Sequence, residues 1–388
     1  MLGFSRDEIN NLKAEFTINE IAQQPKMWRE VLKLYNGLAD QIKTFQTQLQ
    51  NKPYKYILVG AGTSEFVGNV LFEYLKTQGL DAVSIATTDI VSNPGLYFKN
   101  DQPTVLISFA RSGNSPESQA TVEYAKQLIS DLVQIIIICN KEGQLAVKNH
   151  DDHKSLVLLL PEATNDKSFA MTSSFTSMLL YCLVALTKDD NSDHLAQEIN
   201  NIINIVDNVI NNDYQIIKKI AQEDHQRIIF LGSNILKGYA QEAHLKVLEL
   251  SAGEVTTFFN SSLGFRHGPK SVVNNESLIV FFLSQNPYTR QYDLDLLKEI
   301  AHDQVAKTIV VIDHLNDNNV TKYCHYYLTN DSSSETKDIV AGLSYIVRAQ
   351  IYAVYKAIWL NKSPDNPCPT GEVNRVVKGV TIYPYQNK

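Results

Sequence analysis

Residues 55–75 read KYILVGAGTSEFVGNVLFEYL and decide the fold, because they join an expected strand to an expected amphipathic helix. The apolar, β-branched run stops at Gly60, a turn of small and polar residues follows, and apolar residues then recur with a helical period. Residues 227–250, RIIFLGSNILKGYAQEAHLKVLEL, repeat this order with Gly232 at the corresponding stop. A pattern that occurs twice predicts a duplicated domain.

The same order of elements recurs downstream of each copy. In the first half, strands are expected over residues 104–109 and 133–139, with a helix between them that runs to Leu128. In the second half, residues 277–283 and 308–313 are the corresponding strands. Continuous apolar strands that alternate with amphipathic helices indicate parallel sheets covered on both faces. The predicted fold class is therefore α/β, with two tandem doubly wound, flavodoxin-like sheets that bind ligands at the carboxyl ends of their strands.

The length of 388 residues suits two domains. We expect an N-terminal helical segment over residues 1–50, a first domain over 51–215 and a second over 216–388. The start of the chain, MLGFSRDEINNLKAEF, carries charges where a secretory signal needs an apolar run. The apolar helix expected over residues 339–360 has charged residues at or within its ends, so we interpret it as a buried helix and not as a membrane span.

Charge and cysteine content narrow the possible partners. The net charge is −7 without basic runs or stripes, which argues against nucleic acid and anionic membranes. A small anionic ligand is still compatible, because a local pocket of backbone amides outweighs a diffuse negative field. The four cysteines form no Cys-x-x-Cys pair, so we expect reduced thiols, a cytoplasmic location and neither a metal nor another cofactor.

The turn after the first expected strand, residues 60–65 (GAGTSE), has the composition of an anion site. Gly62 lets backbone N–H groups approach an oxyanion, and Thr63 and Ser64 add hydroxyls at the positive end of the next helix. A dinucleotide-binding G-x-G-x-x-G motif is absent, because Glu65 occupies the position of its last glycine.

A second turn in the first half, residues 110–115 (ARSGNS), offers the hydroxyls of Ser112 and Ser115 just before Pro116. Each turn alone is equally typical of an ordinary tight connection. At equivalent strand ends of one sheet, however, the two turns would converge on one crevice, and the pair is more specific than either part. The second half lacks this density of serines, so we expect only the first half to bind phosphate.

Charged residues of the second half are candidates for proton transfer. Glu242, Lys246 and Glu249 share one helix face. For helices in general the commoner reading is a solvated stripe with a salt bridge, but the leucines between these residues indicate a packed helix. His267 lies in the loop GFRHGPK, where an imidazole can act as an acid or base, although a lone loop histidine is more often a surface residue. Residues 150–153 (HDDH) look like metal ligands, but they lie in a charged loop and we expect no metal there.

These motifs resemble the sugar isomerase (SIS) domain family, in which two such domains lie in tandem. The whole chain is similar to AgaS-type tagatose-6-phosphate ketose/aldose isomerases, also described as galactosamine-6-phosphate deaminases. The resemblance covers nearly all residues and rests on four segments: residues 20–28 (EIAQQPKMW), 108–118 (SFARSGNSPES), 265–269 (FRHGP) and 374–381 (NRVVKGVT).

The resemblance implies a set of residues that bind the sugar phosphate. They come from both polar turns and from a looser match further along the chain: Gly62, Thr63, Ser64, Arg111, Ser112, Ser115 and Thr172. Ala110 stands where the isomerase half of glucosamine-6-phosphate synthase has a serine, so Arg111 would supply a compensating charge.

The resemblance also implies the residues that carry the chemistry. Glu249 would move a proton between C2 and C1 of the sugar, with Glu242 and Lys246 on the same helix. His267 would open the sugar ring from a neighbouring subunit, and Lys378 in the tail would form an imine with ketose substrates. We therefore expect at least a homodimer.

The implied function is conversion of D-galactosamine 6-phosphate to D-tagatose 6-phosphate and ammonia. The chain shows no glutaminase domain of the kind found in glucosamine-6-phosphate synthase, so ammonia release is the expected direction. Because water would complete that release, we expect the protein to be a hydrolase as well as an isomerase. Two alternatives stay open, namely a plain isomerase of tagatose and galactose 6-phosphates and a non-catalytic sugar-phosphate sensor.

Overall fold

The computed structural model describes residues 1–50, 52–188, 192–332, 335–375, 377 and 379–386. Contacts divide the chain into two compact units, which we name after the copies of the repeat that they contain. The first lobe comprises Lys26–Asp166, Met171–Leu195 and Glu372–Lys388, and the second lobe comprises Met1–Pro25, Lys167–Ala170 and Ala196–Gly371. The domain limits expected from the sequence, residues 50 and 215, stay a prediction.

The first lobe contains a five-stranded parallel sheet with the order β2-β1-β3-β4-β5. Its strands are β1 (Lys55–Gly60), β2 (Asp81–Ala86), β3 (Thr104–Ala110), β4 (Leu132–Ile138) and β5 (Ser155–Leu159). The strand order is that of a flavodoxin-like doubly wound sheet. Strands β1 and β3 are neighbours, with Val59 opposite Ser108, so their carboxyl ends meet at the point where the winding direction reverses.

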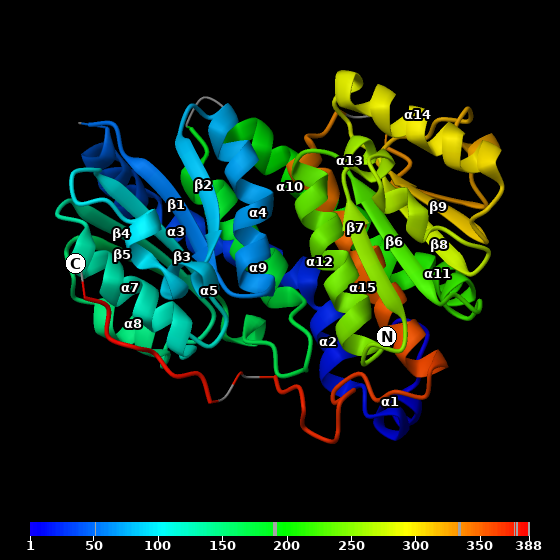
Figure 1. Cartoon of the computed structure of the whole chain (residues 1–388), viewed down its shortest axis with the longest axis horizontal. Coiled ribbons are helices and arrows are strands. Elements are labelled where there is room, and N and C mark those ends of the chain that lie inside the picture. Colours follow the sequence, from blue (N-terminus) through cyan, green and yellow to red (C-terminus); the bar gives the residue numbers. More distant parts are fainter. Residues whose placement is uncertain (51, 189–191, 333–334, 376, 378, 387–388) are drawn as a thin grey trace. The chain divides into compact units, whose positions relative to one another are not determined.

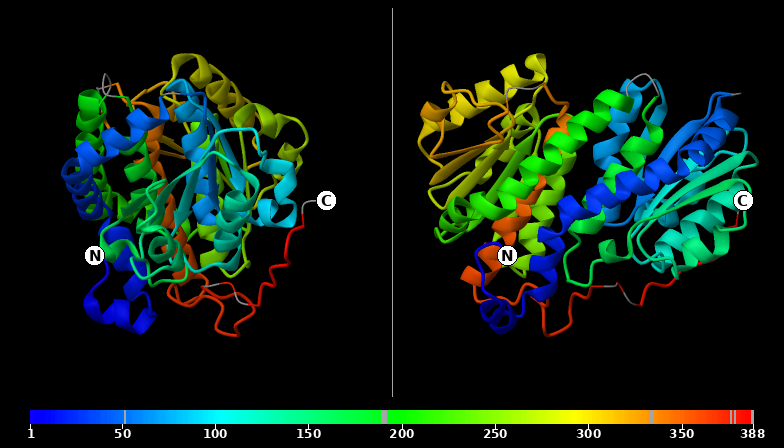
Figure 2. Two further views of the ribbon diagram at one scale, coloured as in Figure 1. Left: turned by 90° about the vertical axis from the view of Figure 1, so that its left-hand side faces the viewer. Right: turned by 180° about the vertical axis from the view of Figure 1, so that it is seen from behind.

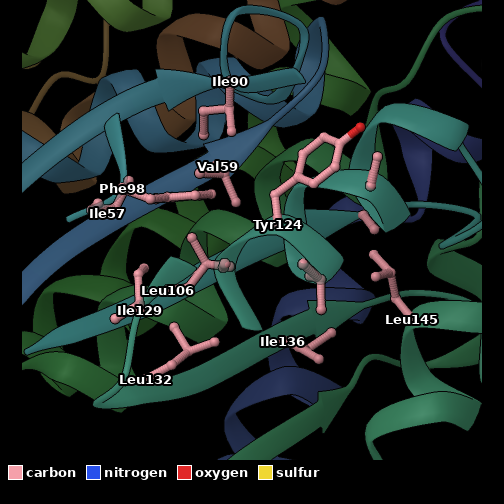
Figure 3. Packing of buried hydrophobic residues seen from close by; sticks show 14 of the residues in the cluster. Ile57, Val59, Ile90, Phe98, Leu106, Tyr124, Ile129, Leu132, Ile136 and Leu145 are labelled. Atoms are coloured by element: carbon pink, nitrogen blue, oxygen red, sulfur yellow. The ribbon is translucent and has the colours of Figure 1, made fainter. Parts of the chain in front are cut away.

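Helices cover both faces of this sheet (Figure 1). They are α3 (Gln24–Leu49), α4 (Thr63–Thr77), α5 (Thr87–Ser92), α6 (Pro94–Tyr97), α7 (Pro116–Leu128), α8 (Gln144–Asn149) and α9 (Ser173–Leu186). On one face, Ile57 and Leu106 of the strands belong to the same buried cluster as Tyr124 of α7 and Leu145 of α8 (Figure 3). Burial of this apolar face holds the turns at the strand ends in place.

The second lobe repeats the topology, with the order β10-β9-β8-β6-β7. Its strands are β6 (Arg227–Gly232), β7 (Thr256–Asn260), β8 (Ser277–Phe282), β9 (Thr308–Asp313) and β10 (Tyr326–Thr329). Its helices and the helices leading to it are α1 (Arg6–Leu12), α2 (Glu15–Ala22), α10 (Ser192–Asn208), α11 (Tyr214–Ala221), α12 (Ile235–Leu250), α13 (Ser262–Arg266), α14 (Pro287–Asp303) and α15 (Asp338–Trp359). Both sheets and the helical N-terminal segment confirm the predicted fold class.

The repeat extends to the backbone of the first turn in each lobe. Gly62 has φ 55° and ψ −129°, and Asn234 has φ 51° and ψ −122° at the same place before its helix. A Cβ atom on Gly60 would lie 2.3 Å from the carbonyl carbon of Ser64, so only glycine fits where the chain turns into α4. The glycine that stops each strand is therefore a steric requirement of the strand-to-helix turn.

Helix α15 is the apolar helix that the sequence predicts to be buried. From Ile339 to Ala357 all its residues are buried. Within the described ranges, no helix is long and apolar enough to cross a membrane. Strands β2, β5, β7 and β10 were not recognised in the sequence. Strands β5, β7 and β10 have only four or five residues, and β2 and β7 are partly exposed along most of their length, so none of the four forms a long apolar run.

Candidate active site

The two polar turns of the first lobe follow adjacent strands of one sheet. Thr63 and Ser64 are the first two residues of α4, directly after β1, and both are buried. The second turn, residues 111–115, connects β3 to α7. Because β1 and β3 are paired in parallel, both turns lie at the same edge of the sheet, at its topological switch point. Ligands bind to doubly wound sheets at this position.

The second turn is held in one conformation by residues 140–145. The amide of Asn140 donates to the carbonyl of Ser112 at 3.1 Å, and the backbone N–H of Leu145 donates to the carbonyl of Gly113, also at 3.1 Å. Gly113 has φ 68°, and a Cβ there would lie 2.4 Å from Cδ1 of Ile138. Ser112 and Ser115 are half-buried and keep accessible surface. The turn thus presents two hydroxyls from a preorganised backbone, and the hydroxyl of Ser115 donates to that of Ser118 at 2.6 Å.

A third segment, at the start of α9, is organised by a residue that the sequence analysis missed. The buried Asp166 carboxylate accepts the N–H of Thr172 at 2.8 Å and that of Ser174 at 2.9 Å. It also accepts the hydroxyls of Ser173 and Ser174 at 2.6 Å each. Thr172 is fully buried, and its hydroxyl has no hydrogen-bond partner among the described residues. An Asp six residues before a Thr-Ser-Ser run was the available signal for this cap.

Arg111 joins the second turn to the C-terminal tail. Its side chain is largely buried, and Nη2 donates to the carbonyl oxygen of Arg375 at 2.9 Å. The Arg375 guanidinium in turn donates to the main-chain carbonyl of Asp166. Lys378, predicted to form an imine, lies outside the described residues, so its role stays a prediction.

In the second lobe, α12 carries the predicted proton-transfer residues. Nζ of Lys246 lies 3.2 Å from Oε1 of Glu242 and 2.7 Å from Oε2 of Glu249. The side chains of Glu242 and Lys246 have no exposed surface, whereas that of Glu249 is 25% exposed. These residues are therefore not a solvated stripe, and Glu249 is the member of the group that reaches the surface.

The ammonium of Lys246 lies between two carboxyl groups. Burial acts to lower the pKa of Lys246, but the carboxylates of Glu242 and Glu249 outweigh it and raise that pKa above its usual value. Lys246 therefore stays protonated and holds one oxygen of Glu249 by a charge-assisted hydrogen bond.

His267 follows α13 on an exposed loop. The flanking residues tie this loop to α14, because Nε of Arg266 lies 2.8 Å from Oε2 of Glu299 and Nζ of Lys270 lies 2.6 Å from Oδ2 of Asp303. The imidazole is thus presented to solvent from an anchored loop.

In the second lobe, a buried carboxyl group fills the position that corresponds to the polar turns of the first lobe. Asp293 of α14 is fully buried and accepts the hydroxyls of Ser233 and Ser262, each at 2.5 Å. It also accepts the backbone N–H of Ser284 at 3.2 Å. Ser233 and Ser284 follow β6 and β8, the neighbouring strands at this sheet's switch point. Burial raises the pKa of Asp293 above its usual value, despite the hydrogen bonds that it accepts. The protein's own carboxyl group fills this position, which gives a steric reason why phosphate binding would be confined to the first lobe.

Among the described residues, no group of three or more histidine, cysteine, aspartate or glutamate side chains is placed to hold a metal ion. All four cysteines are free thiols.

Two tandem flavodoxin-like sheets, one of them with hydroxyl-lined turns at its switch point, define a doubly wound α/β protein with a candidate small-anion site. The SIS domain family matches residues 48–188 and 219–358, and the chain belongs to this family. It is 42% identical to the D-galactosamine-6-phosphate deaminase AgaS of Shewanella sp. over 98% of this chain and 95% of that protein. It is 37% identical to the Escherichia coli protein of that name over 96% of each chain. The recognised resemblance is thereby confirmed.

Solved structures agree with this assignment. A candidate tagatose-6-phosphate ketose/aldose isomerase of Clostridium novyi superposes with a TM-score of 0.96 at 42% identity, over 99% of both chains. The tagatose-6-phosphate ketose/aldose isomerase of Escherichia coli gives a TM-score of 0.88 at 34% identity, over 96% of this chain and 97% of that one.

One expectation from the sequence is wrong. The similar proteins are named as deaminases and ketose/aldose isomerases, and these names do not support the expected description as a hydrolase. The expectation rested on the water that would complete ammonia release, whereas the names of these relatives describe deamination and isomerisation.

Proposed function

We propose that this enzyme converts D-galactosamine 6-phosphate to D-tagatose 6-phosphate with release of ammonia. The observation that carries the proposal is the buried Glu242–Lys246–Glu249 group on α12, which holds one partly exposed carboxylate ready for proton transfer. The similarity to proteins named D-galactosamine-6-phosphate deaminase, over nearly the full chain, supports this substrate.

The turns of the first lobe are proposed to hold the phosphate. Thr63 and Ser64 would contribute hydroxyl groups at the start of α4, where the helix dipole favours an anion. Ser112 and Ser115 would add hydroxyl donors, and Gly62 would let the backbone approach. Thr172, whose hydroxyl is buried and unpartnered among the described residues, would join the substrate contacts.

Glu249 is proposed to take the proton from C2 of the open-chain sugar and to return it at C1. A base in this role needs a fixed orientation and an accessible oxygen. Lys246 supplies the orientation through its 2.7 Å hydrogen bond, and the 25% exposure of Glu249 supplies the access. Lys246 and Glu242, which have no exposed surface, would act through Glu249 and not on the sugar directly.

His267 is proposed to open the sugar ring from a neighbouring copy of the chain, so that the active form is at least a homodimer. Its exposure on an anchored loop supports this role, because an exposed imidazole can be offered to a partner. We further propose a cytoplasmic location, in keeping with the four free thiols.

A second candidate function is favoured by the structural relatives. Two of them are described as tagatose-6-phosphate ketose/aldose isomerases. The same proton shuttle would interconvert galactose 6-phosphate and tagatose 6-phosphate if the sugar carried a hydroxyl at C2.

A substrate panel tests the proposal. Purified enzyme is given galactosamine, glucosamine, N-acetylgalactosamine and galactose 6-phosphates, and both ammonia and ketose phosphate are measured. Ammonia in equal amount to ketose from galactosamine 6-phosphate supports the deaminase. Formation of ketose phosphate from galactose 6-phosphate, with no ammonia from galactosamine or glucosamine 6-phosphate, would contradict the deaminase and support the isomerase.

A further inference from the structure

Helix α7 begins directly after the second polar turn, and its first turn contains a buried serine, Ser118, that the proposed phosphate site does not include. Figure 2 shows α7 in blue-green alongside the strands of the first lobe. Ser115 is the N-cap residue of this helix, and Pro116 and Ser118 are its first and third residues. Ala120 and Leu128 of α7 belong to the buried core cluster, so the start of the helix is fixed in place.

Ser115 occupies the N-cap position but does not cap the helix. A serine at this position usually accepts a hydrogen bond from the N–H of the second or third helical residue. The side chain of Ser115 makes no such bond, and its hydroxyl instead donates to the hydroxyl of Ser118 at 2.6 Å. Pro116 has no N–H, so the N–H groups of Glu117 and Ser118 are the donors that a Ser115 cap would have used. The start of α7 thus keeps two backbone donors at the positive end of the helix dipole.

The hydroxyls of Ser112 and Ser115 differ in what they can offer an anion. The Ser112 hydroxyl accepts the N–H of Asn114 at 3.3 Å, and its own proton has no acceptor among the residues that the structure describes. The proton of Ser115, by contrast, is donated to Ser118. A phosphate dianion accepts hydrogen bonds and has no proton to donate, so Ser115 can bind it only when its proton is redirected to the anion.

We propose that Ser118 is a positioning residue, which acts on the phosphate through Ser115. The Ser118 oxygen holds the Ser115 hydroxyl away from the N–H groups of α7. When the phosphate binds, the Ser115 proton turns towards the anion, and the Ser118 hydroxyl donates to the Ser115 oxygen. Both hydroxyls keep a hydrogen bond, and the chain from Ser118 through Ser115 to the phosphate is cooperative. This inference rests on the proposed function, which assigns the phosphate to this turn.

Replacing Ser118 by alanine tests the role, because Ser115 should then turn back and cap α7 itself. We expect the dissociation constant of inorganic phosphate, measured by calorimetry, to rise about 3- to 10-fold, as for loss of a hydrogen bond to a charged group. KM for galactosamine 6-phosphate should rise by a similar factor, with kcat changed less than about twofold. The midpoint of urea unfolding should stay the same or rise, because the helix gains a cap.

Two matched variants accompany Ser118→Ala. Ser118→Thr keeps the hydroxyl and should recover most of the phosphate affinity. Ser130→Ala removes an exposed serine before β4 and should match the wild type in affinity and stability. A weaker affinity in Ser118→Ala that comes with a lower unfolding midpoint would indicate general loosening of the helix and would overturn the proposal.

A double-mutant cycle with Ser115→Ala shows whether Ser118 acts through Ser115. Ser115→Ala should itself weaken phosphate binding, and adding Ser118→Ala should cause no further loss. Independent losses in the two variants would overturn the proposal. If the wild type converts no sugar phosphate, the proposed function fails, and the calorimetric comparison alone then decides the role of Ser118. Equal phosphate binding by the wild type and Ser118→Ala, including no binding by either, would contradict that role.

Discussion

The ammonium of Lys246 and the carboxylate of Glu249 are joined by a hydrogen bond of 2.7 Å between Nζ and Oε2 on helix α12. The lysine side chain is fully buried, and the glutamate side chain is a quarter exposed. A base that is oriented by a buried partner and is partly exposed to solvent can contact a substrate without reorganising. This relationship underlies the first two predictions.

Replacing Glu249 by glutamine should abolish proton transfer and leave substrate binding nearly intact. The amide keeps the shape of the side chain but cannot take a proton, so kcat should fall by about 10²–10⁴-fold with little change in KM. Deuterium uptake at C1 and C2 of the sugar in D₂O measures the step directly. The control is Glu276→Gln, which changes an exposed glutamate ahead of β8. A Glu249→Gln enzyme with more than about a tenth of wild-type turnover would contradict the role.

Replacing Lys246 by methionine should destabilise the fold as well as the activity. The buried Glu242 carboxylate would lose its 3.2 Å partner, and breaking a buried ion pair from one side costs about 3–5 kcal/mol in the free energy of unfolding. Urea unfolding followed by circular dichroism measures the change. Lys237→Met, at an exposed position of the same helix, is the matched control.

The double variant Glu242→Gln/Lys246→Met separates charge from packing. It removes both buried charges and should recover part of the lost stability. Equal unfolding free energies for Lys246→Met and Lys237→Met would show that the buried pair does not contribute.

Replacing Ser112 by alanine should weaken substrate binding without slowing the chemistry. The substitution also removes the 3.3 Å hydrogen bond from the N–H of Asn114 to the Ser112 hydroxyl, but Asn140 and Leu145 still hold the turn, so its backbone should keep its conformation. We expect KM to rise several-fold, corresponding to about 1 kcal/mol or more for a hydrogen bond to a charged group, with kcat conserved. Ser130→Ala, at an exposed position before β4, should leave both constants unchanged. An unaltered KM in Ser112→Ala would place the phosphate elsewhere.

Stability should fall as pH rises from about 4 to about 6 because of Asp338. Burial raises the pKa of this carboxyl to about 6 from 3.8, despite the hydrogen bonds that it accepts from Ser284 and Gln285. The folded state therefore binds the proton more tightly than the unfolded chain, and ionisation between these values costs folding free energy. This loss of stability with rising pH is opposite in sign to the effect of a carboxylate stabilised by a salt bridge, which gains stability as pH rises.

Asp338→Asn keeps the shape of the side chain and removes the ionisation. Relative to the wild type, the variant should gain about 1–3 kcal/mol of unfolding free energy between pH 4.5 and pH 7.5. Denaturant unfolding across this range measures the difference. Parallel pH profiles for the two proteins would show that Asp338 does not titrate in this window.

Mixing two inactive variants tests whether the site is shared between subunits. If His267 serves a neighbouring chain, a Glu249→Gln and His267→Asn mixture should form heterodimers in which one of two sites is intact. Random exchange of subunits should then restore about a quarter of wild-type activity. Light scattering after chromatography gives the oligomeric state in the same experiment. No recovery after verified exchange would mean that both residues act within one chain.

The strand-to-helix turns show what could be read from the sequence. Apolar runs that stop at Gly60 and Gly232 indicated both sheets, because a parallel strand must be apolar on both faces and a tight turn admits only glycine there. Glu242, Lys246 and Glu249 could be placed on one face, because helical spacing is a local property. The contact between Asp166 and Arg375 could not be predicted from the sequence, because the two residues lie 209 positions apart in the chain.

The amino-acid sequence by itself determined the duplicated α/β architecture, the position of the polar turns and the helix that carries Glu249, since periodicity and turn chemistry act over a few residues. Only the tertiary structure decided that Lys246 is buried between two carboxyl groups and that Asp293 fills the space between the strand-end turns of the second lobe. It also decided that Arg375 connects the turn after β3 to Asp166. Burial and long-range hydrogen bonds arise when distant segments pack together, and no local pattern encodes which partners they acquire.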